Sequence, residues 1–312
     1  MSDRVLVTGA AGYLGSILVP ELLAQGFSVT ALDTFARNDG ALNAVAAHPG
    51  FEPIRGDTRD KPLVERLVAK ADIVIPLAAL VGAPICKQDP LNAQTINQDA
   101  IVDIIGMMSP AQRILYPTTN SGYGIGTQGE YCTEETPLNP ISLYGVTKVE
   151  AEKAVLGREN GASLRLATVF GMAPRMRLDL LVNDFTYRAV TDRAVVIFEG
   201  HFKRNYIHVR DVTKAFLHTI ANFETMRGNA FNVGLSDANL SKNELCARIQ
   251  KYVPEFVPIE APIGEDPDKR DYIVSNAKIE ATGFRPDHSL DAGIQELIRG
   301  YRMIRNAKFG NV

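Results

Sequence analysis

The sequence predicts an α/β protein built on a doubly wound parallel sheet, with helices on both faces. Two observations support this fold class. Short apolar runs alternate with segments of helical periodicity from the start of the chain, and a glycine-rich turn follows the first apolar run. With 312 residues and 46% hydrophobic content, the chain can bury a sizeable core. We therefore expect one compact unit with two lobes.

The first strand is predicted at residues 5–7, and a helix is predicted to reach about Gln25. The turn between them reads Thr8-Gly9-Ala10-Ala11-Gly12-Tyr13-Leu14-Gly15. Glycines allow the backbone to approach a pyrophosphate, and the N-terminus of the following helix presents free N–H groups to it. An ordinary turn is the alternative. The order of strand, turn and helix favours a Rossmann-type dinucleotide site, whose contacts would be Gly9, Ala11, Gly12, Tyr13 and Leu14.

The second predicted strand, residues 28–32, ends at Asp33, roughly 20 residues after the glycine turn. A carboxylate at this position can accept hydrogen bonds from both ribose hydroxyls of an adenosine, and it would repel a 2′-phosphate. The position therefore favours NAD over NADP. Arg37 is close enough in sequence to weaken that preference.

The third and fourth strands are predicted at residues 51–55 and 72–77. Asp57 and Thr58 follow the third strand. The fourth ends at Leu77, and Ala78 and Ala79 come next. Small side chains there leave room for a pyrophosphate and a ribose, although close packing explains them equally well. A helical pattern then covers residues 90–108.

Tyr144 and Lys148 lie four residues apart in a predicted helix, residues 141–157, so they share one face. At about 4 Å and an effective dielectric constant of about 20, a unit charge pair contributes roughly 4 kcal/mol. That is enough to bring a phenol pKa from about 10 to near 7. The pair is therefore a candidate general base, with a solvent-facing helix turn as the alternative. Thr119 follows a predicted strand at residues 113–116.

The glycine turn, Thr119 and the Tyr144/Lys148 pair together resemble the extended short-chain dehydrogenase/reductases of the NAD-dependent epimerase/dehydratase family, which modify nucleotide sugars. Tyr123-Gly124 matches the end of the family's strand-end motif. The resemblance covers nearly the whole chain. It implies that Thr119, Tyr144 and Lys148 form a catalytic triad and that the cofactor is NAD.

The resemblance also assigns further cofactor contacts. It implies that Asp57 contacts the adenine and that Asn97 lies beneath the active site. A buried helix amide bonded to backbone is the alternative for Asn97. The remaining expected cofactor contacts are Thr58, Leu77, Ala78, Ala79, Tyr144 and Lys148.

In the second half, strands are predicted at residues 162–169 and 194–198 and a helix at 179–190. Residues 204–212 resemble the family's Arg-Asp-hydrophobic-hydrophobic-x-Val-x-Asp-Val, with Asn205 in place of the Asp. The resemblance implies that Arg204 and Arg270 bind the substrate diphosphate, and each charged hydrogen bond contributes roughly 1.5 to 3 kcal/mol. A solvated surface charge is the alternative for either arginine.

We expect the NAD-binding domain to take residues 1–170 plus about 205–235. A smaller, discontinuous α/β substrate lobe would take about 171–204 and 236–312. Relatives pack the helix at residues 90–108 and the helix carrying Tyr144 against a second subunit, which implies a homodimer.

The expected reaction begins when a Tyr144 phenolate takes the proton of a sugar hydroxyl, at C4, while that carbon gives its hydride to NAD. Lys148 would lower the phenol pKa and orient the nicotinamide ribose. Thr119 would hydrogen-bond the reacting oxygen.

Three further expected substrate contacts, Asn120, Ser121 and Thr168, bear on the fate of the ketone. Asn120 and Ser121 stand where the family's 4,6-dehydratases carry an Asp-Glu pair, and Ser121 also stands where 3,5-epimerases carry a Cys. Both reactions are therefore disfavoured. Thr168 stands where many C4 epimerases and dehydratases have an Asn that touches the substrate, which indicates a different sugar pocket from that of UDP-galactose epimerase.

Two activities remain, a net dehydrogenase that releases a 4-keto sugar and a C4 epimerase with a transient ketone. Residues 118–124 and 131–135 look most like the subgroup that contains bacterial GDP-heptose C4 dehydrogenases. A non-catalytic dinucleotide-binding regulatory protein is the alternative of another class.

Composition and residue spacing disfavour several classes of partner and site. A net charge of -3 gives no basic field for nucleic acid. Cys86, Cys132 and Cys246 have no spacing typical of a disulfide framework or a zinc site, so we expect no metal. The apolar run at residues 5–20 contains glycines and lacks a basic n-region, so it indicates a strand and helix rather than a signal peptide. We expect a cytoplasmic protein without a membrane span.

Overall fold

A computed structural model describes residues 3–36, 40–264 and 270–304 of the chain. Arg37, a residue that could weaken the preference for NAD, lies outside these ranges. In the described part, no helix combines the length and the apolar character needed to cross a membrane.

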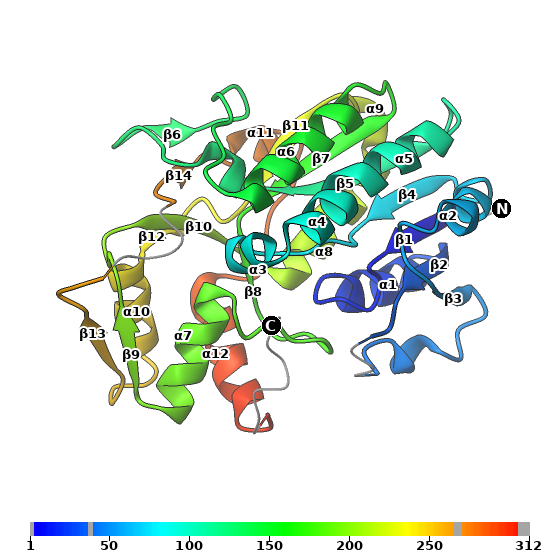
Figure 1. The fold of residues 1–312 in the computed structure, drawn as a ribbon. Coiled ribbons are helices and arrows are strands. Elements are labelled where there is room, and N and C mark those ends of the chain that lie inside the picture. The colour runs from blue at the N-terminus through cyan, green and yellow to red at the C-terminus, as the bar shows by residue number, and fades with distance from the viewer. Residues whose placement is uncertain (1–2, 37–39, 265–269, 305–312) are drawn as a thin grey trace.

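A seven-stranded parallel sheet forms the centre of the larger lobe (Figure 1). Its strand order is β11-β7-β5-β4-β1-β2-β3. The strands are β1 (Arg4–Thr8), β2 (Ser28–Asp33), β3 (Phe51–Arg55), β4 (Ile73–Pro76), β5 (Arg113–Thr119), β7 (Gly161–Leu166) and β11 (Ala230–Val233). The order reverses between β1 and β4, which is where open parallel sheets bind their ligands. The predicted doubly wound α/β fold, of the Rossmann type, is confirmed.

Helices cover both faces of this sheet. One face carries α2 (Lys61–Val68), α5 (Ala100–Met107) and α6 (Leu143–Leu156), and the other carries α1 (Gly15–Ala24) and α8 (Val209–Ala221). Strand β1 contributes to both faces, because successive side chains of a strand point to opposite sides of the sheet. Val5 and Val7 pack with α1, whereas Leu6 packs with α2, α5 and α6.

The predicted helix at residues 90–108 is found as a continuous helical stretch with a π-helical segment inside it. It comprises α4 (Pro90–Gln94), the π segment (Thr95–Asp99) and α5. Asp89 begins it by accepting a hydrogen bond from Asn92 N at 3.1 Å. Such π segments are frequent at functional sites, and this one contains Asn97.

The smaller lobe is built from short sheets and a group of helices; most of it, including β9 and β13, is drawn to the lower left of the large sheet in Figure 1, whereas β6 and β14 are drawn at the upper left. The sheets are β12-β10-β8, β13-β9 and β14-β6. Helices α7 (Leu181–Thr191), α10 (Lys242–Gln250) and α12 (Leu290–Tyr301) pack on one another. The strands are β6 (Tyr131–Cys132), β8 (Thr168–Phe170), β9 (Ala194–Ile197), β10 (Lys203–His208), β12 (Asn239–Ser241), β13 (Val257–Glu260) and β14 (Ile273–Val274).

Several short helical elements complete the described chain. They are α3 (Ala83–Gln88), α9 (Phe223–Met226), α11 (Ala277–Ala281) and the 3-10 helices η1 (Asn43–Val45) and η3 (Asn120–Tyr123).

The strand predicted at residues 162–169 is interrupted at Ala167. Up to Leu166 the chain pairs with β5 in the large sheet, and from Thr168 it pairs with β10 in a small one. Strand β10 remains in that small sheet, and the chain returns to the large sheet only at β11. The division into an NAD-binding domain and a discontinuous substrate lobe remains a proposal. The crossing at Ala167 takes the chain past the carboxyl ends of the central strands.

Candidate active site

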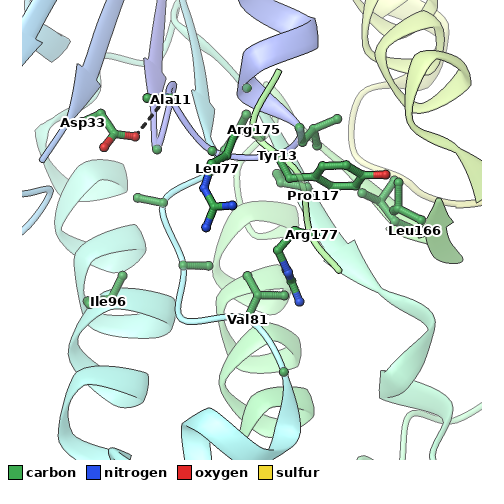
Figure 2. A pocket seen from close by; sticks show the side chains of 18 of the residues that line it. Ala11, Tyr13, Asp33, Leu77, Val81, Ile96, Pro117, Leu166, Arg175 and Arg177 are labelled. Atoms are coloured by element: carbon green, nitrogen blue, oxygen red, sulfur yellow. Dashed lines mark hydrogen bonds between the residues drawn. The ribbon is translucent and has the colours of Figure 1, made fainter. Parts of the chain in front are cut away.

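A cavity of about 570 Å³ opens at the carboxyl ends of the central strands. The glycine turn, the ends of β2, β4 and β5, the start of α6 and the segment after β8 line it (Figure 2). Every residue predicted to contact the cofactor lines this cavity except Asn97. The sequence-predicted dinucleotide residues and the Thr119, Tyr144 and Lys148 side chains therefore share one space.

Close backbone packing explains two of the glycines in the turn. Gly9 has a φ of +65°, and a Cβ there would lie 2.6 Å from the backbone nitrogen of Ala78. A Cβ on Gly15 would lie 2.3 Å from the carbonyl oxygen of Ala10. No side chain caps the N-terminus of α1, so its N–H groups can meet an anionic ligand.

Tyr13 differs from the rest of the turn, because its hydroxyl is engaged in the protein. It donates a hydrogen bond to the carbonyl oxygen of Gly171 at 2.7 Å, and Figure 2 shows its ring extending sideways from the turn. Tyr13 thus ties the glycine turn to the segment that follows β8.

Asp33 sits at the end of β2 with both carboxylate oxygens bonded to backbone. Oδ2 accepts from Ala11 N at 2.9 Å, the dashed line in Figure 2, and Oδ1 accepts from Phe35 N at 2.8 Å. A carboxylate has about four lone-pair sites. Asp33 can therefore accept ribose hydroxyls while it holds the turn.

Asp57 and Thr58 also face the cavity. Hydrogen bonds from Arg59, at 2.9 and 2.6 Å, hold the pKa of Asp57 below its usual value. The hydroxyl oxygens of Thr58 and Thr118, which both line the cavity, are buried without a hydrogen-bond partner among the described residues. An unpaired buried hydroxyl costs about 1–3 kcal/mol, so a polar ligand here would find two partners.

Asn97 is 1% exposed and outside the cavity lining. Its Oδ1 accepts from Leu80 N at 2.7 Å and its Nδ2 donates to Leu80 O at 2.9 Å. These contacts match the alternative of a buried helix amide bonded to backbone. Asn97 fixes the loop after β4, and through it the cavity wall formed by Leu77, Ala78 and Ala79.

Helix α6 brings Tyr144 and Lys148 to the cavity. Ser142 caps the helix by accepting from Gly145 N at 3.1 Å. Lys148 is 4% exposed, and its Nζ lies 4.0 Å from the centre of the Tyr116 ring. Tyr144 is partly exposed. Both residues line the cavity one helical turn apart.

The electrostatics of the pair are dominated by burial. Burial raises the pKa of Tyr144 to about 12, against the charges of Arg177 and Arg270 and a hydrogen bond with Thr119, which lower it. Burial lowers the pKa of Lys148 to about 7, and the charge of Glu152 raises it. The cations that favour the phenolate thus include two arginines.

Thr119 ends β5 beside Tyr144. Its Oγ1 shares a hydrogen bond with Ser121 Oγ at 2.8 Å and accepts from Ser121 N at 3.1 Å. Arg270 Nη1 also donates to Ser121 Oγ. These contacts bring Thr119, Ser121 and Arg270 together in the cavity lining.

The predicted substrate residues divide into two groups. Ser121, Thr168 and Arg270 line the cavity, whereas Asn120 and Arg204 do not. Asn120 is buried, with neither amide atom hydrogen-bonded among the described residues. The guanidinium of Arg204 lies 5.7 Å from the centre of the Tyr272 ring, which is itself part of the lining.

Arg175 and Arg177 were not singled out from the sequence, and both are buried and line the cavity. Figure 2 shows their guanidinium groups turned into it. Asn183 holds their segment by accepting from Gly171 N at 3.0 Å and donating to Arg177 O at 2.9 Å. The sequence offered one signal for these two residues, because a pair of arginines soon follows a strand that ends near the cavity.

Known proteins resemble this chain over most of its length. The model of the NAD dependent epimerase/dehydratase family matches residues 5–234. The low-salt glycan biosynthesis protein Agl12 of Haloferax volcanii is 31% identical over 95% of this chain and 98% of that protein. A UDP-glucose 4-epimerase of Mycolicibacterium smegmatis is 30% identical over 96% of this chain and 98% of that protein.

A solved structure supports the same fold. The crystal structure of a UDP-glucuronic acid 4-epimerase from Bacillus cereus, in complex with UDP-glucuronic acid and NAD, matches with a TM-score of 0.84. The match covers 96% of this chain and 99% of that one, at 22% identity. Because the family model spans most of the chain and two relatives match it nearly end to end, this chain belongs to the NAD-dependent epimerase/dehydratase family.

Proposed function

We propose that this protein oxidises the sugar of a nucleoside diphosphate sugar at C4, giving a 4-keto sugar. The observation that carries the proposal is that Thr119, Tyr144 and Lys148 line the same cavity as the glycine turn and Asp33. A hydroxyl, a phenol and an ammonium beside a dinucleotide site are suited to removing a proton and a hydride from one alcohol.

The cavity residues fit NAD, the cofactor of this family. The glycine turn leaves no room for side chains against the backbone of Ala78, and the N-terminus of α1 can face a pyrophosphate. Asp33 can accept ribose hydroxyls, and the hydroxyls of Thr58 and Thr118 gain a partner. Bound NAD would supply the hydride acceptor, so the alcohol carbon becomes a ketone.

Tyr144 takes the proton of the C4 hydroxyl in its phenolate form. Because burial raises the pKa of Tyr144 to about 12, the phenolate needs stabilisation. Arg177, Arg270 and the Thr119 hydroxyl act in that direction. Lys148, when charged, adds a further cation one helical turn away.

The substrate class follows from the arginines and from the relatives. Arg175, Arg177 and Arg270 line one cavity, and guanidinium groups match the oxygens of a diphosphate. Relatives with similar sequences include a UDP-glucose 4-epimerase. Arg204 does not line the cavity, whereas the Tyr272 ring, 5.7 Å from its guanidinium, does.

The fate of the ketone separates the two candidate activities. Elimination of water is disfavoured, because Asn120 is buried outside the cavity lining and Ser121 carries only a hydroxyl. A C4 epimerase, in which the ketone turns over and is reduced again, is the second candidate, supported by the relative of that name. Membership of the GDP-heptose C4 dehydrogenase subgroup and a homodimeric state remain predictions.

A substrate panel tests the proposed function. Purified protein is mixed with NAD and UDP, GDP, dTDP and CDP sugars, and NADH absorbance is read together with sugar NMR. We expect lasting NADH and a ketosugar with one of them. An inverted sugar without net NADH would establish the epimerase instead. Silence across the panel would contradict both and favour a non-catalytic binding protein.

Replacing Tyr144 with Phe should lower turnover of the active sugar by about 10²- to 10⁴-fold, because the general base is lost. NAD affinity, measured by calorimetry, should be little changed, because Phe keeps the ring and the other predicted cofactor contacts remain. The matched control is Tyr131→Phe, a tyrosine that is 57% exposed and outside the cavity. Full activity in Tyr144→Phe would rule out the proposed base.

Replacing Asp33 with Asn should reduce the preference for NAD over NADP by about tenfold, equivalent to about 1.4 kcal/mol. The loss of the carboxylate removes repulsion of the 2′-phosphate. The measurement is kcat/KM for both cofactors with the active sugar. Asp57→Asn serves as the control, because a contact at the adenine affects both cofactors equally. An unchanged ratio in Asp33→Asn would show that another residue sets the preference.

A further inference from the structure

Helix α6 carries a third ionisable residue on the face that holds Tyr144 and Lys148. Glu152 lies four residues after Lys148 and is 2% exposed. Unlike Tyr144 and Lys148, it does not line the cavity. The helix therefore places a phenol, an ammonium and a carboxylate in a row, with the carboxylate inside the protein.

Two residues on β7 bond the side chain of Glu152. Its Oε1 accepts from Arg165 Nη2 at 2.6 Å and from Arg165 Nε at 3.0 Å. Its Oε2 accepts from Ser163 Oγ at 2.8 Å. These charge-assisted bonds fix the carboxylate between α6 and β7.

The same arginine reaches the turn that carries Thr119. Arg165 Nη1 donates to Tyr123 Oη at 3.1 Å and to Glu134 O at 3.2 Å. Tyr123 in turn donates to Asn232 Oδ1 at 2.7 Å. The ion pair therefore joins α6 to the end of the 3-10 turn after Thr119.

Lys148 faces few charged or titratable groups. The Tyr116 ring packs on it from β5, Tyr144 and Glu152 flank it on α6, and Arg165 of β7 lies beyond Glu152. The remaining groups, Cys86 of α3, Arg177 and Arg270, act on Tyr144. Burial opposes the charge of Lys148 and Glu152 supports it.

We propose that Glu152, fixed by Arg165 and Ser163, is a positioning residue that keeps the Lys148 ammonium charged beside Tyr144. The inference rests on the proposed function for its meaning in catalysis. The effect of Glu152 on the charge of Lys148 is a property of the protein alone and can be measured without substrate. Removing the negative charge should make Lys148 lose its proton at lower pH, and removing the guanidinium should have the opposite effect.

Two single variants that break the same ion pair separate this role from a structural one. Glu152→Gln should lower the titration midpoint of Lys148 by about one pH unit, a tenfold change in its acid constant. Arg165→Met leaves the carboxylate less neutralised, so it should raise the midpoint. A pair that merely holds the fold would shift the midpoint in one direction for both variants, or leave it unchanged.

The midpoints are measured by NMR of the full chain with ¹³C at the lysine ε-carbons, and the Lys148 signal is assigned by its loss in Lys148→Met. Glu150→Gln is the matched control, because Glu150 is a neighbouring acid on α6 whose partner is the exposed Lys153, at 2.7 Å. Its Lys148 midpoint should equal that of the natural protein.

Breaking a buried ion pair on one side can unfold a protein, whereas removing both partners is often tolerated. The double variant Glu152→Gln/Arg165→Met should therefore fold and still show a lowered Lys148 midpoint, because the lost carboxylate is the nearer charge. An unchanged midpoint in the double variant, or shifts of the same sign in the two single variants, would overturn the proposal.

The pH dependence of turnover tests whether Glu152 acts on catalysis. With the active sugar, the alkaline limb of the kcat profile should move to lower pH in Glu152→Gln by the same amount as the NMR midpoint. A limb that stays in place would overturn the positioning role. Failure of the proposed function is distinguished by the natural protein, which would then titrate normally at Lys148 without turning over any sugar.

Discussion

The cost of a buried ammonium is the constraint on which the arrangement of this site depends. Lys148 is almost fully buried, and a charge in that position is unfavourable unless other groups compensate it. Its neighbours provide part of that compensation, with the Tyr116 ring on one side and Glu152 one helical turn away. The Arg165–Glu152 pair then links α6 to β7 and to the turn after Thr119.

The rest of the architecture forms the cavity that Lys148 lines. Parallel strands end at one edge, and the reversal of strand order between β1 and β4 opens a space there. The chain leaves the large sheet at Ala167, and the next segment carries Arg175 and Arg177 into the cavity. Tyr13 and Asn183 hold that segment against the glycine turn. The cavity thus gains cations from α6 and from the segment after β8.

Local patterns allowed much of this to be predicted from sequence. The glycine turn, Asp33 and the spacing of Tyr144 and Lys148 each depend on residues close together in the chain. The interruption at Ala167 was missed because residues 162–169 are uniformly suited to a strand, and only pairing with β10 divides them. Arg175 and Arg177 were missed, and the position of Arg204 was not foreseen, because tertiary packing decides which loop arginines face a cavity.

The proposed chemistry requires that C4 of the sugar is the carbon oxidised in this cavity. The most direct measurement uses the active nucleotide sugar carrying deuterium at C4, with NADH formation followed in a single turnover and the product NADH weighed by mass spectrometry. We expect a rate several-fold lower than with the unlabelled sugar, and one deuterium in the NADH. An unchanged rate together with unlabelled NADH would place the oxidation at another carbon and contradict the proposal.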